Sequence, residues 1–587
     1  MLTKKNLHLG LLIIYIAGIS FPAVSYSSQD WVATSDGHTQ FLLNKLGQFA
    51  PEAIGYIGGK GLDERISQLS EEFDKKAIQE LNNLLAEMET RRKSEKHPRV
   101  RQDLDILIDF LKNNIEETDL SDRLLLPYKD PVELIFLGLN ALLTDQVAES
   151  RRPAALVRLR RYTGLEPGWT SILNQAEDRL RDSMKNRGLL GPFRGEVELD
   201  LKLAPRYIAG ISALLEKYDL TGGAEALSAL EKQFKAWEVF VRQEILPRSR
   251  DDHRLPSELY RLKLKQHGID MPLEELVSRS QAAFREIQNE MRVIASLIAE
   301  KRGWPTHDYR QVIREFKKEQ LDPEKAVARY RERIGYLARV ASENKIVTFP
   351  TRDLIIRLAT EAESSATPGP SMKMPPMIGN TGEMGEFIIA LGRDEGPKAD
   401  DFTHEAATWT LAAHEGRPGH ELQITRTLEN GISKARALFG LNTAAVEGWA
   451  LYIEAEMKPY LPLEGQLFSL QYRLLRAARG FLDPGLQTGD ISPETALRVL
   501  THEVVLSEPL ARLELERYID KNPGQAPAYF CGYTRMMDLR AEIEHRLGEK
   551  FDQLKYHDAL MSIGPVPISL VRRTLMEDFV PAMLKQE

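Results

Sequence analysis

Apolar side chains at every third or fourth position, repeated over long stretches, are the feature that most constrains this fold. In residues 66–88 the stripe begins with Ile66, Leu69 and Phe73 and continues to Met88, with charged residues and Gln among the positions between. This period matches one face of an α-helix rather than the two-residue alternation of a strand. The sequence therefore predicts a mainly α-helical protein. Similar patterns occur in residues 103–114, 224–247, 272–301, 323–342, 404–415, 441–457, 466–482, 493–519 and 534–548.

Strand-like patterns are scarce, and only one small β element is expected. The two best candidates are residues 352–358 and residues 386–391, which read EFIIAL. A length of 587 residues exceeds one ordinary domain. The polar stretch at 247–256 carries proline at both ends. We therefore expect an N-terminal helical subdomain over residues 26–250 and a C-terminal helical subdomain over residues 251–587.

The N-terminus is typical of a secretory signal peptide over residues 1–25. Lys4 and Lys5 precede a short apolar run, and Ala-Val-Ser at 23–25 is a small-x-small cleavage site. An uncleaved anchor would need about 20 apolar residues, and this run is shorter. Because no cysteine follows the run, a bacterial lipid anchor is not expected. The sequence predicts an exported protein without a membrane anchor, periplasmic if the source is Gram-negative.

Charge and cysteine content exclude several classes of protein. The net charge is −8, with 78 Lys and Arg against 86 Asp and Glu. A protein that wraps nucleic acid would need a basic balance, so no nucleic-acid partner is expected. Cys531 is the only cysteine, which rules out an intrachain disulfide framework and cysteine-ligated zinc or iron–sulfur sites. A metal in this protein would need histidine and carboxylate ligands.

The residues suited to chemistry are concentrated in the segment THEAATWTLAAHEGRPGHELQ. His414 and His420 flank Glu415 and a Gly-Arg-Pro-Gly bend. In the zinc motif HExxH the histidines lie four residues apart on one helix face, and the glutamate is the general base. Here the spacing is six residues. Six residues of an intact helix rotate by about 600°, which leaves the two histidines roughly 120° apart and unable to share one metal.

Pro418 offers a way to bring the two histidines together. Proline cannot continue a regular helix, but it is favoured in the first turn of a new one. We hypothesise that the helix breaks at residues 416–417 and restarts at Pro418, with His420 swung back toward His414. The alternative is that each histidine is a hydrogen-bonded structural residue. The combined motif favours a zinc site.

Catalytic zinc usually has three protein ligands and one open position. Glu447 is the best candidate for the third ligand, because it is the only charged residue from Thr443 to Ile453 on an apolar helix. A lone carboxylate is costly to bury unless it is paired or binds a metal. Glu454 is the second candidate, either as the ligand or as a group that supports one. The alternative is a salt bridge between Glu447 and an arginine.

The blocks HEGRPGHELQ and EGWALYIE resemble the bacterial family called domain of unknown function 885. That family is related to helical zinc metallopeptidases such as thermostable carboxypeptidase, the oligopeptidases and angiotensin-converting enzyme. The resemblance implies a large helical fold with a central cleft and one Zn²⁺ per chain. Glu421 and Gln487 stand where the family often has histidine, which bears on substrate preference more than on metal binding. Further blocks fit the family at 255–269, 476–487, 522–540 and 551–567.

The resemblance also suggests candidates outside the metal motif. Tyr529, Tyr533 and His557 could donate hydrogen bonds to the oxyanion that forms during peptide hydrolysis. Arg540 could hold a substrate carboxylate, since a guanidinium group matches a carboxylate in geometry. The strand around Phe387 could offer an edge to an extended peptide.

The sequence thus predicts an exported zinc metallopeptidase that hydrolyses short peptides or peptide-like amides. His414, His420 and Glu447 would bind the metal, and Glu415 would take a proton from water and pass it to the leaving amine. Two alternatives stay open: a metal-dependent hydrolase of another bond, such as an ester or non-peptide amide, and a non-catalytic periplasmic binding protein. No sequence feature indicates an oligomeric state.

Overall fold

The structure is a computed structural model, and within residues 30–585 it describes the whole chain except 58, 145–146, 360–368, 376, 378–379, 381 and 391–399. The predicted signal peptide lies outside the described residues. The described chain is mainly helical with one small sheet, which confirms the fold class predicted from periodicity. Among the helices of this part of the chain, none has the length and apolar character needed to cross a membrane.

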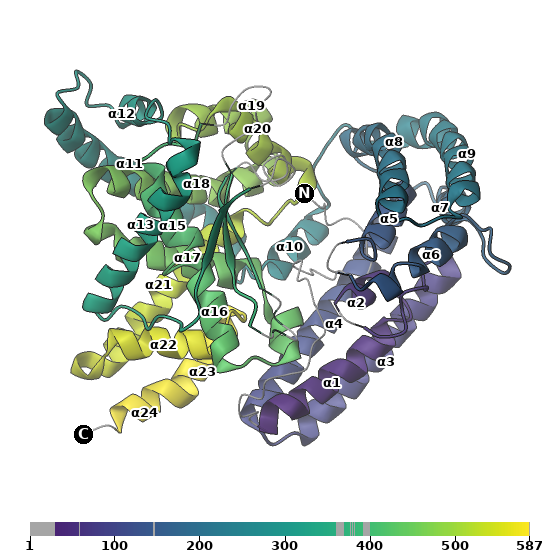
Figure 1. The fold of residues 1–587 in the computed structure, drawn as a ribbon, viewed down its shortest axis with the longest axis horizontal. Helices are drawn as coiled ribbons and strands as arrows, with labels where there is room; N and C mark the ends of the chain where they lie inside the picture. Colours follow the sequence, from purple (N-terminus) through teal and green to yellow (C-terminus); the bar gives the residue numbers. More distant parts are fainter. Residues whose placement is uncertain are drawn as a thin grey trace.

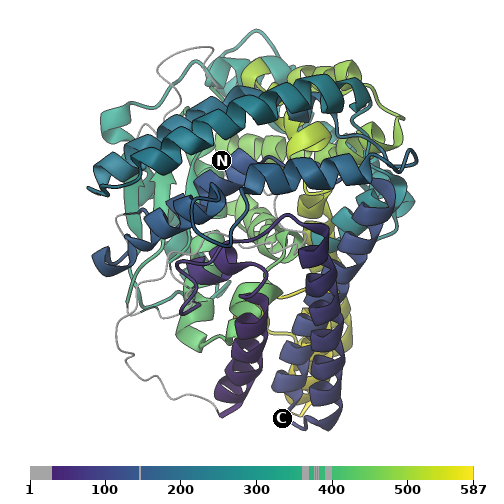
Figure 2. The same ribbon diagram turned by 90° about the vertical axis from the view of Figure 1, so that its right-hand side faces the viewer.

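The N-terminal helices form one side of the molecule, coloured purple to blue in Figure 1 and turned toward the viewer in Figure 2. They are α1 (Asp30–Leu46), α2 (Pro51–Tyr56), α3 (Glu71–Ser94), α4 (Pro98–Leu124), α5 (Pro131–Asn140), α6 (Ala154–Tyr162), α7 (Ile172–Ser183), α8 (Arg194–Lys217) and α9 (Ala224–Phe240). The helix predicted over 66–88 begins later, at Glu71, because the Ser70 hydroxyl accepts a hydrogen bond from the Phe73 N–H and caps it.

The C-terminal helices form the other side, coloured teal to yellow in Figure 1. They are α10 (Ser257–Gln266), α11 (Leu273–Arg302), α12 (Tyr309–Phe316), α13 (Pro323–Glu343), α15 (Ala407–Glu415), α16 (His420–Asn430), α17 (Thr443–Met457), α18 (Leu463–Thr488), α19 (Pro493–Arg498), α20 (Glu508–Glu516), α21 (Pro527–Leu547), α22 (Gln553–Ile563), α23 (Ile568–Thr574) and α24 (Val580–Leu584). Helices α11 and α18 pack along each other, and so do α17 and α21. These two pairs set the positions of the side chains described below.

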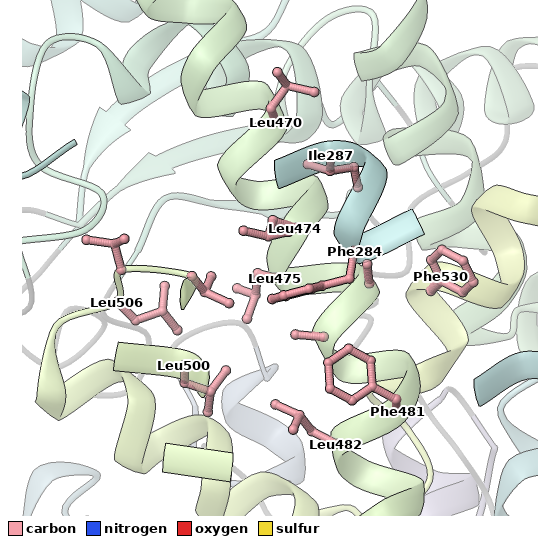
Figure 3. Close-up of a cluster of buried hydrophobic side chains, with 14 of the residues drawn as sticks. Phe284, Ile287, Leu470, Leu474, Leu475, Phe481, Leu482, Leu500, Leu506 and Phe530 are labelled. Atoms are coloured by element: carbon pink, nitrogen blue, oxygen red, sulfur yellow. The ribbon is translucent and has the colours of Figure 1, made fainter. Parts of the chain in front are cut away.

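A large apolar cluster fills the space between α11, α18 and α21 (Figure 3). Phe284 of α11 meets Phe481 of α18 edge to face, with ring centroids 5.4 Å apart. Leu474 and Leu482 of α18 are fully buried beside them, and Phe530 is contributed by α21. Each such side chain stabilises the fold by about 1.5–3 kcal/mol relative to exposure. The core therefore holds α11, α18 and α21 against one another.

The small sheet has the strand order β1-β3-β2, and it is the only sheet in the described part of the chain. Its strands are β1 (Ile355–Leu358), β2 (Ser371–Lys373) and β3 (Glu386–Ile389). Strand β3 pairs parallel with β1 and antiparallel with β2, so it is central. Phe387 lies on this central strand, buried against the Tyr330 ring at 4.9 Å. The edge beside α15 is therefore β2, and not the strand around Phe387 that we expected.

A buried ion pair joins the N-terminal helices to the C-terminal helices. Asp103 of α4 accepts a hydrogen bond of 2.7 Å from Nε of Arg436, the first residue of the π-helical segment Arg436–Gly440 that precedes α17. Its other carboxylate oxygen accepts from the hydroxyls of Ser35 and Ser433, at 2.5 Å each. Arg436 also donates to the Ile563 carbonyl at 2.9 Å. The two halves of the chain therefore share one buried polar network.

We expect Asp103→Ala to lower the free energy of unfolding by about 3–5 kcal/mol, because it leaves the Arg436 charge buried without its carboxylate. Urea denaturation of the purified protein measures this change. Asp119→Ala is the matched control on the same helix, since the pair of Asp119 with Arg123 is exposed and should contribute less than about 1 kcal/mol. Equal losses in the two variants would contradict the role given to the Asp103 network.

Candidate metal centre

The helix that carries His414 breaks where the sequence predicts. Helix α15 ends at Glu415, and α16 begins at His420. The restart is two residues later than expected, since Pro418 lies in the connection and not in the new helix. The Arg417–Pro418 peptide bond is cis. Across the break between the two helices, the rings of His414 and His420 lie nearly perpendicular to each other, with centroids 4.8 Å apart.

Gly419 makes this close turn sterically feasible. A β-carbon at this position would lie 1.9 Å from the carbonyl oxygen of His414 and 2.3 Å from that of Ala413. Both contacts are with backbone atoms, which cannot rotate away as a side chain could. Only glycine therefore lets the start of α16 approach the end of α15 this closely.

We expect Gly419→Ala to lower the free energy of unfolding by about 1–3 kcal/mol. It should also weaken zinc binding at least about tenfold, since His420 follows directly and would move with the backbone. Zinc titration against a competing chelator, with thermal denaturation alongside, measures both effects. Gly335→Ala serves as the control, because its added β-carbon would meet no atom within 4 Å. Unchanged zinc affinity in Gly419→Ala would contradict this account of the turn.

Three potential metal ligands converge at the break. The Nε2 atoms of His414 and His420 lie 3.4 Å and 3.3 Å from the same oxygen, Oε2 of Glu447. The three ligand atoms all lie within 4.8 Å of one another. Both histidines are buried, whereas the Glu447 side chain keeps 17% exposure. This cluster could hold a metal ion that is reached from one side.

Two features of the cluster fit a metal: the types of its three ligands, and a buried Glu447 oxygen that lacks a well-directed hydrogen bond from the described residues. Two imidazoles and one carboxylate form a ligand set known from catalytic zinc sites. Oε2 of Glu447 is buried, yet it accepts no well-directed hydrogen bond from any described residue. Such an oxygen is costly to bury unless a cation satisfies it.

Glu454 lies behind His414 rather than beside Glu447. Its Oε2 is 3.2 Å from His414 Nδ1, and its other oxygen accepts a hydrogen bond of 3.2 Å from the Ser469 hydroxyl. This contact orients the ring so that Nε2 points toward Glu447. Of the two candidates for the third ligand, the geometry therefore places Glu447 in the cluster and Glu454 in support.

The charges of the cluster compensate one another. Burial lowers the pKa of His414, but the carboxylates of Glu447 and Glu454 outweigh this and raise it to about 9. Burial raises the pKa of Glu447, but His420 and His414 hold it well below its usual range. The carboxylate of Glu447 is therefore kept ionised, the form in which it can bind a metal, whereas His414 has to release its proton when a metal binds.

Glu415 lies at the rim of the cluster. Its Oε1 is 4.0 Å from His414 Nε2, and its Oε2 accepts a hydrogen bond of 3.0 Å from the backbone N–H of Met372 on β2. The side chain keeps 18% exposure. One oxygen is therefore held by the edge strand, while the other faces the cluster and is suited to accept a proton.

The two predicted tyrosines lie on α21, and the hydroxyl of each accepts a hydrogen bond from an arginine. The Tyr529 hydroxyl accepts a hydrogen bond from Arg517 at 3.2 Å, and the Tyr533 hydroxyl accepts one from Arg473 at 2.8 Å. Burial, and to a smaller extent the negative charge of Glu447, raise the pKa of Tyr529. In the described part of the chain, neither hydroxyl bonds to the three potential ligands.

His557 lies in a separate buried network on another face of α17. Its Nδ1 donates to the Ile346 carbonyl and its Nε2 accepts from the Tyr452 hydroxyl, both at 2.6 Å. Burial lowers the pKa of His557 to about 4, so the ring is neutral. The Trp449 ring packs edge-on against it at 5.7 Å and donates to the Gly419 carbonyl at 3.3 Å. His557 thus contacts the metal motif through Trp449.

Arg540 belongs to the same network. It donates a hydrogen bond of 2.9 Å to the Tyr452 hydroxyl and one of 2.8 Å to Glu544, and it also pairs with Glu456. Both of its acidic partners come from this chain, which leaves little capacity for the substrate carboxylate that the sequence suggested. The structure therefore groups Arg540 with His557 and not with the metal cluster.

Comparison of the sequence with known families matches the one described as bacterial protein of unknown function (DUF885), over residues 51–575. The chain belongs to this family, as its motif blocks predicted. A search among curated proteins gives no match.

Two solved structures share the fold over nearly their whole lengths. One is described as a lipoprotein of unknown function from Shewanella oneidensis, with a TM-score of 0.74 and 18% identity over 94% of this chain and 100% of that one. The other is described as a lipoprotein from Colwellia psychrerythraea, with a TM-score of 0.70 and 17% identity over 94% and 99%. The structure of BsuCP is far more distant, with a TM-score of 0.38 and 10% identity over 94% and 92%.

Proposed function

We propose that this protein is an exported zinc-dependent peptidase acting on short peptides or peptide-like amides. The observation that supports this most is the bent motif, in which the Nε2 atoms of His414 and His420 face one oxygen of Glu447. Glu415 beside them supplies a carboxylate of the kind that acts as general base in zinc peptidases. This combination of a ligand set and an adjacent base is the pattern of a hydrolytic metal site.

Each residue has a defined role in this proposal. His414, His420 and Glu447 hold the metal, while Glu454 orients the His414 ring. A bound zinc ion supplies a Lewis acid that polarises a carbonyl and acidifies water. Glu415 accepts a proton at Oε1 and passes it to the leaving amine, and the N–H of Met372 keeps its other oxygen in place.

A peptide substrate is supported by the position of β2. Among the described strands β2 pairs only with β3, and although its Met372 N–H already donates to Glu415, the other backbone groups on its outer edge could bind an extended peptide. Because Met372 of β2 also holds Glu415, a peptide on that edge would lie beside the base. Export is supported by the signal-like N-terminus and by the two structural neighbours, which are described as lipoproteins.

Metal analysis of the purified mature protein, followed by a panel of short peptides and matched esters, tests this function. We expect about one zinc per chain, peptide cleavage that stops on chelation, and recovery when zinc is returned. A protein that takes up no zinc when zinc is offered would overturn the proposal. Hydrolysis of the esters alone would retain the metal centre and overturn the peptidase assignment.

A further inference from the structure

A row of polar residues on α18 leads away from the metal cluster. Ser469, Arg473 and Arg476 follow at steps of four and three residues, which places them on one face of the helix. Ser469 donates to Glu454, which contacts His414. Since an α-helix rises 1.5 Å per residue, the two arginines begin about 6 Å and about 10 Å further along the axis. The arginines therefore lie one and two turns beyond the support of the metal site.

These arginines line a pocket of about 450 Å³ between α11, α17, α18 and α21. Leu451, which also lines the pocket, is one turn after Glu447 on α17. The pocket and the metal cluster thus share one face of α17. Tyr529 of α21 lies beside the second arginine, because its ring centroid is 6.0 Å from the Arg476 guanidinium carbon.

Neither arginine has a carboxylate partner among the described residues. Arg473 donates to the Tyr533 hydroxyl at 2.8 Å, and Arg476 donates to the Tyr472 carbonyl at 3.2 Å. The Nε atom of each is buried without an acceptor in the described chain. Arg479, the next arginine on this helix, forms a two-bond ion pair with Glu514 instead. Two half-buried guanidinium groups without a counter-charge are costly, and an anion would offset that cost.

The acidic residues around the pocket do not neutralise the pair. Glu290 is paired with Lys458, and Asp538 is paired with Arg279. Glu286 is exposed at the rim. Once these two ion pairs are set aside, the charged residues that line the pocket are Arg473 and Arg476 against the single exposed carboxylate of Glu286.

We propose that Arg473 and Arg476 bind a carboxylate group of the substrate in this pocket. This inference rests on the proposed function for the identity of the substrate as a peptide, and it adds an anionic group as a requirement for binding. Guanidinium groups match carboxylates in geometry and form short, charge-assisted hydrogen bonds with them. The carboxylate is either the C-terminus of the peptide or an acidic side chain.

Calorimetric titration of the purified Glu415→Gln protein with two peptide pairs separates these sources. The first pair is acetyl-Ala-Ala-Ala as the free acid and as the C-terminal amide. The second is acetyl-Ala-Glu-Ala amide and acetyl-Ala-Gln-Ala amide. We expect the charged member of one pair to bind at least about tenfold more tightly, which is about 1.4 kcal/mol. A preference in the first pair identifies the C-terminus, and a preference in the second identifies a side chain.

Arg473→Gln and Arg476→Gln should each abolish this preference. Arg279→Gln, at the rim of the same pocket, should retain it. Thermal denaturation verifies folding, and Arg473→Lys, which retains the charge, should restore part of the preference. Equal affinities within both pairs, or no binding of any of the four peptides at millimolar concentration, would overturn the inference.

The two proposals fail in different ways. A protein that prefers the charged peptide but binds no zinc and cleaves nothing would retain the carboxylate site and remove the peptidase function. A protein that binds zinc and cleaves charged and neutral peptides equally well would retain the peptidase function and remove the carboxylate site.

Discussion

Glu415→Gln should retain about one zinc per chain and lower kcat for a cleaved peptide by about 10²–10⁴-fold. Glutamine has nearly the same shape and can still accept the hydrogen bond from Met372 N–H, so the cluster stays intact. It cannot take up a proton, so the step assigned to Glu415 is lost. Metal analysis and steady-state kinetics on the same preparation measure both quantities.

Glu405→Gln is the matched control for this variant, because Glu405 also follows a histidine in the sequence. Its carboxylate pairs with Arg329 and not with the cluster, so kcat should stay within a few-fold of the wild type. Loss of zinc from Glu415→Gln would count against the role of Glu415 as a base and indicate a ligand instead.

Glu447→Ala and Glu454→Ala should differ clearly in zinc affinity. Removing Glu447 takes away a ligand atom, and we expect binding to weaken by more than about 10²-fold, with the zinc lost on dialysis. Removing Glu454 takes away only the contact with His414 Nδ1, and losses of about 10–100-fold are typical for such supporting groups. Competition with a chelator measures both affinities.

His414→Ala provides the reference for complete loss of zinc binding in this series. If Glu447→Ala bound zinc like the wild type while Glu454→Ala lost it, the two glutamates would have to exchange roles. Thermal denaturation of each variant without metal separates loss of zinc from loss of fold.

The parts of the fold and site that follow from local chemistry could be predicted from the sequence. The three- and four-residue period identified the helices, since burial of one face is a property of the segment itself. Proline and two glycines between His414 and His420 predicted the break, because proline cannot continue a helix. Glu447 stood out as a charged residue on an apolar helix, where burial of a carboxylate is costly unless it pairs with a cation or binds a metal.

The parts that depend on pairing between distant segments could not be predicted. Nothing in the sequence near Arg540 shows that the distant Glu456 pairs with it, or that Arg473 and Arg476 have no carboxylate partner among the described residues. Met372 acts through its backbone N–H, which every non-proline residue has.

The strand assignments show the same limit. Strand β2 has three residues and no alternation to reveal it, and without β2 the segment around Phe387 looks like an edge. Ladder pairing between segments far apart in sequence decides which strand is central, and this information is not local.

The network of Asp103 and Arg436 has a consequence for how this protein could be divided. Arg436 begins the π-helical segment that comes just before α17, the helix that carries Glu447. A fragment that began at residue 251 would keep every potential ligand, yet Arg436 would lose its carboxylate from α4. We therefore expect the metal-binding part of this chain to depend on the N-terminal helices, which supply the buried counter-charge for the segment that leads into α17.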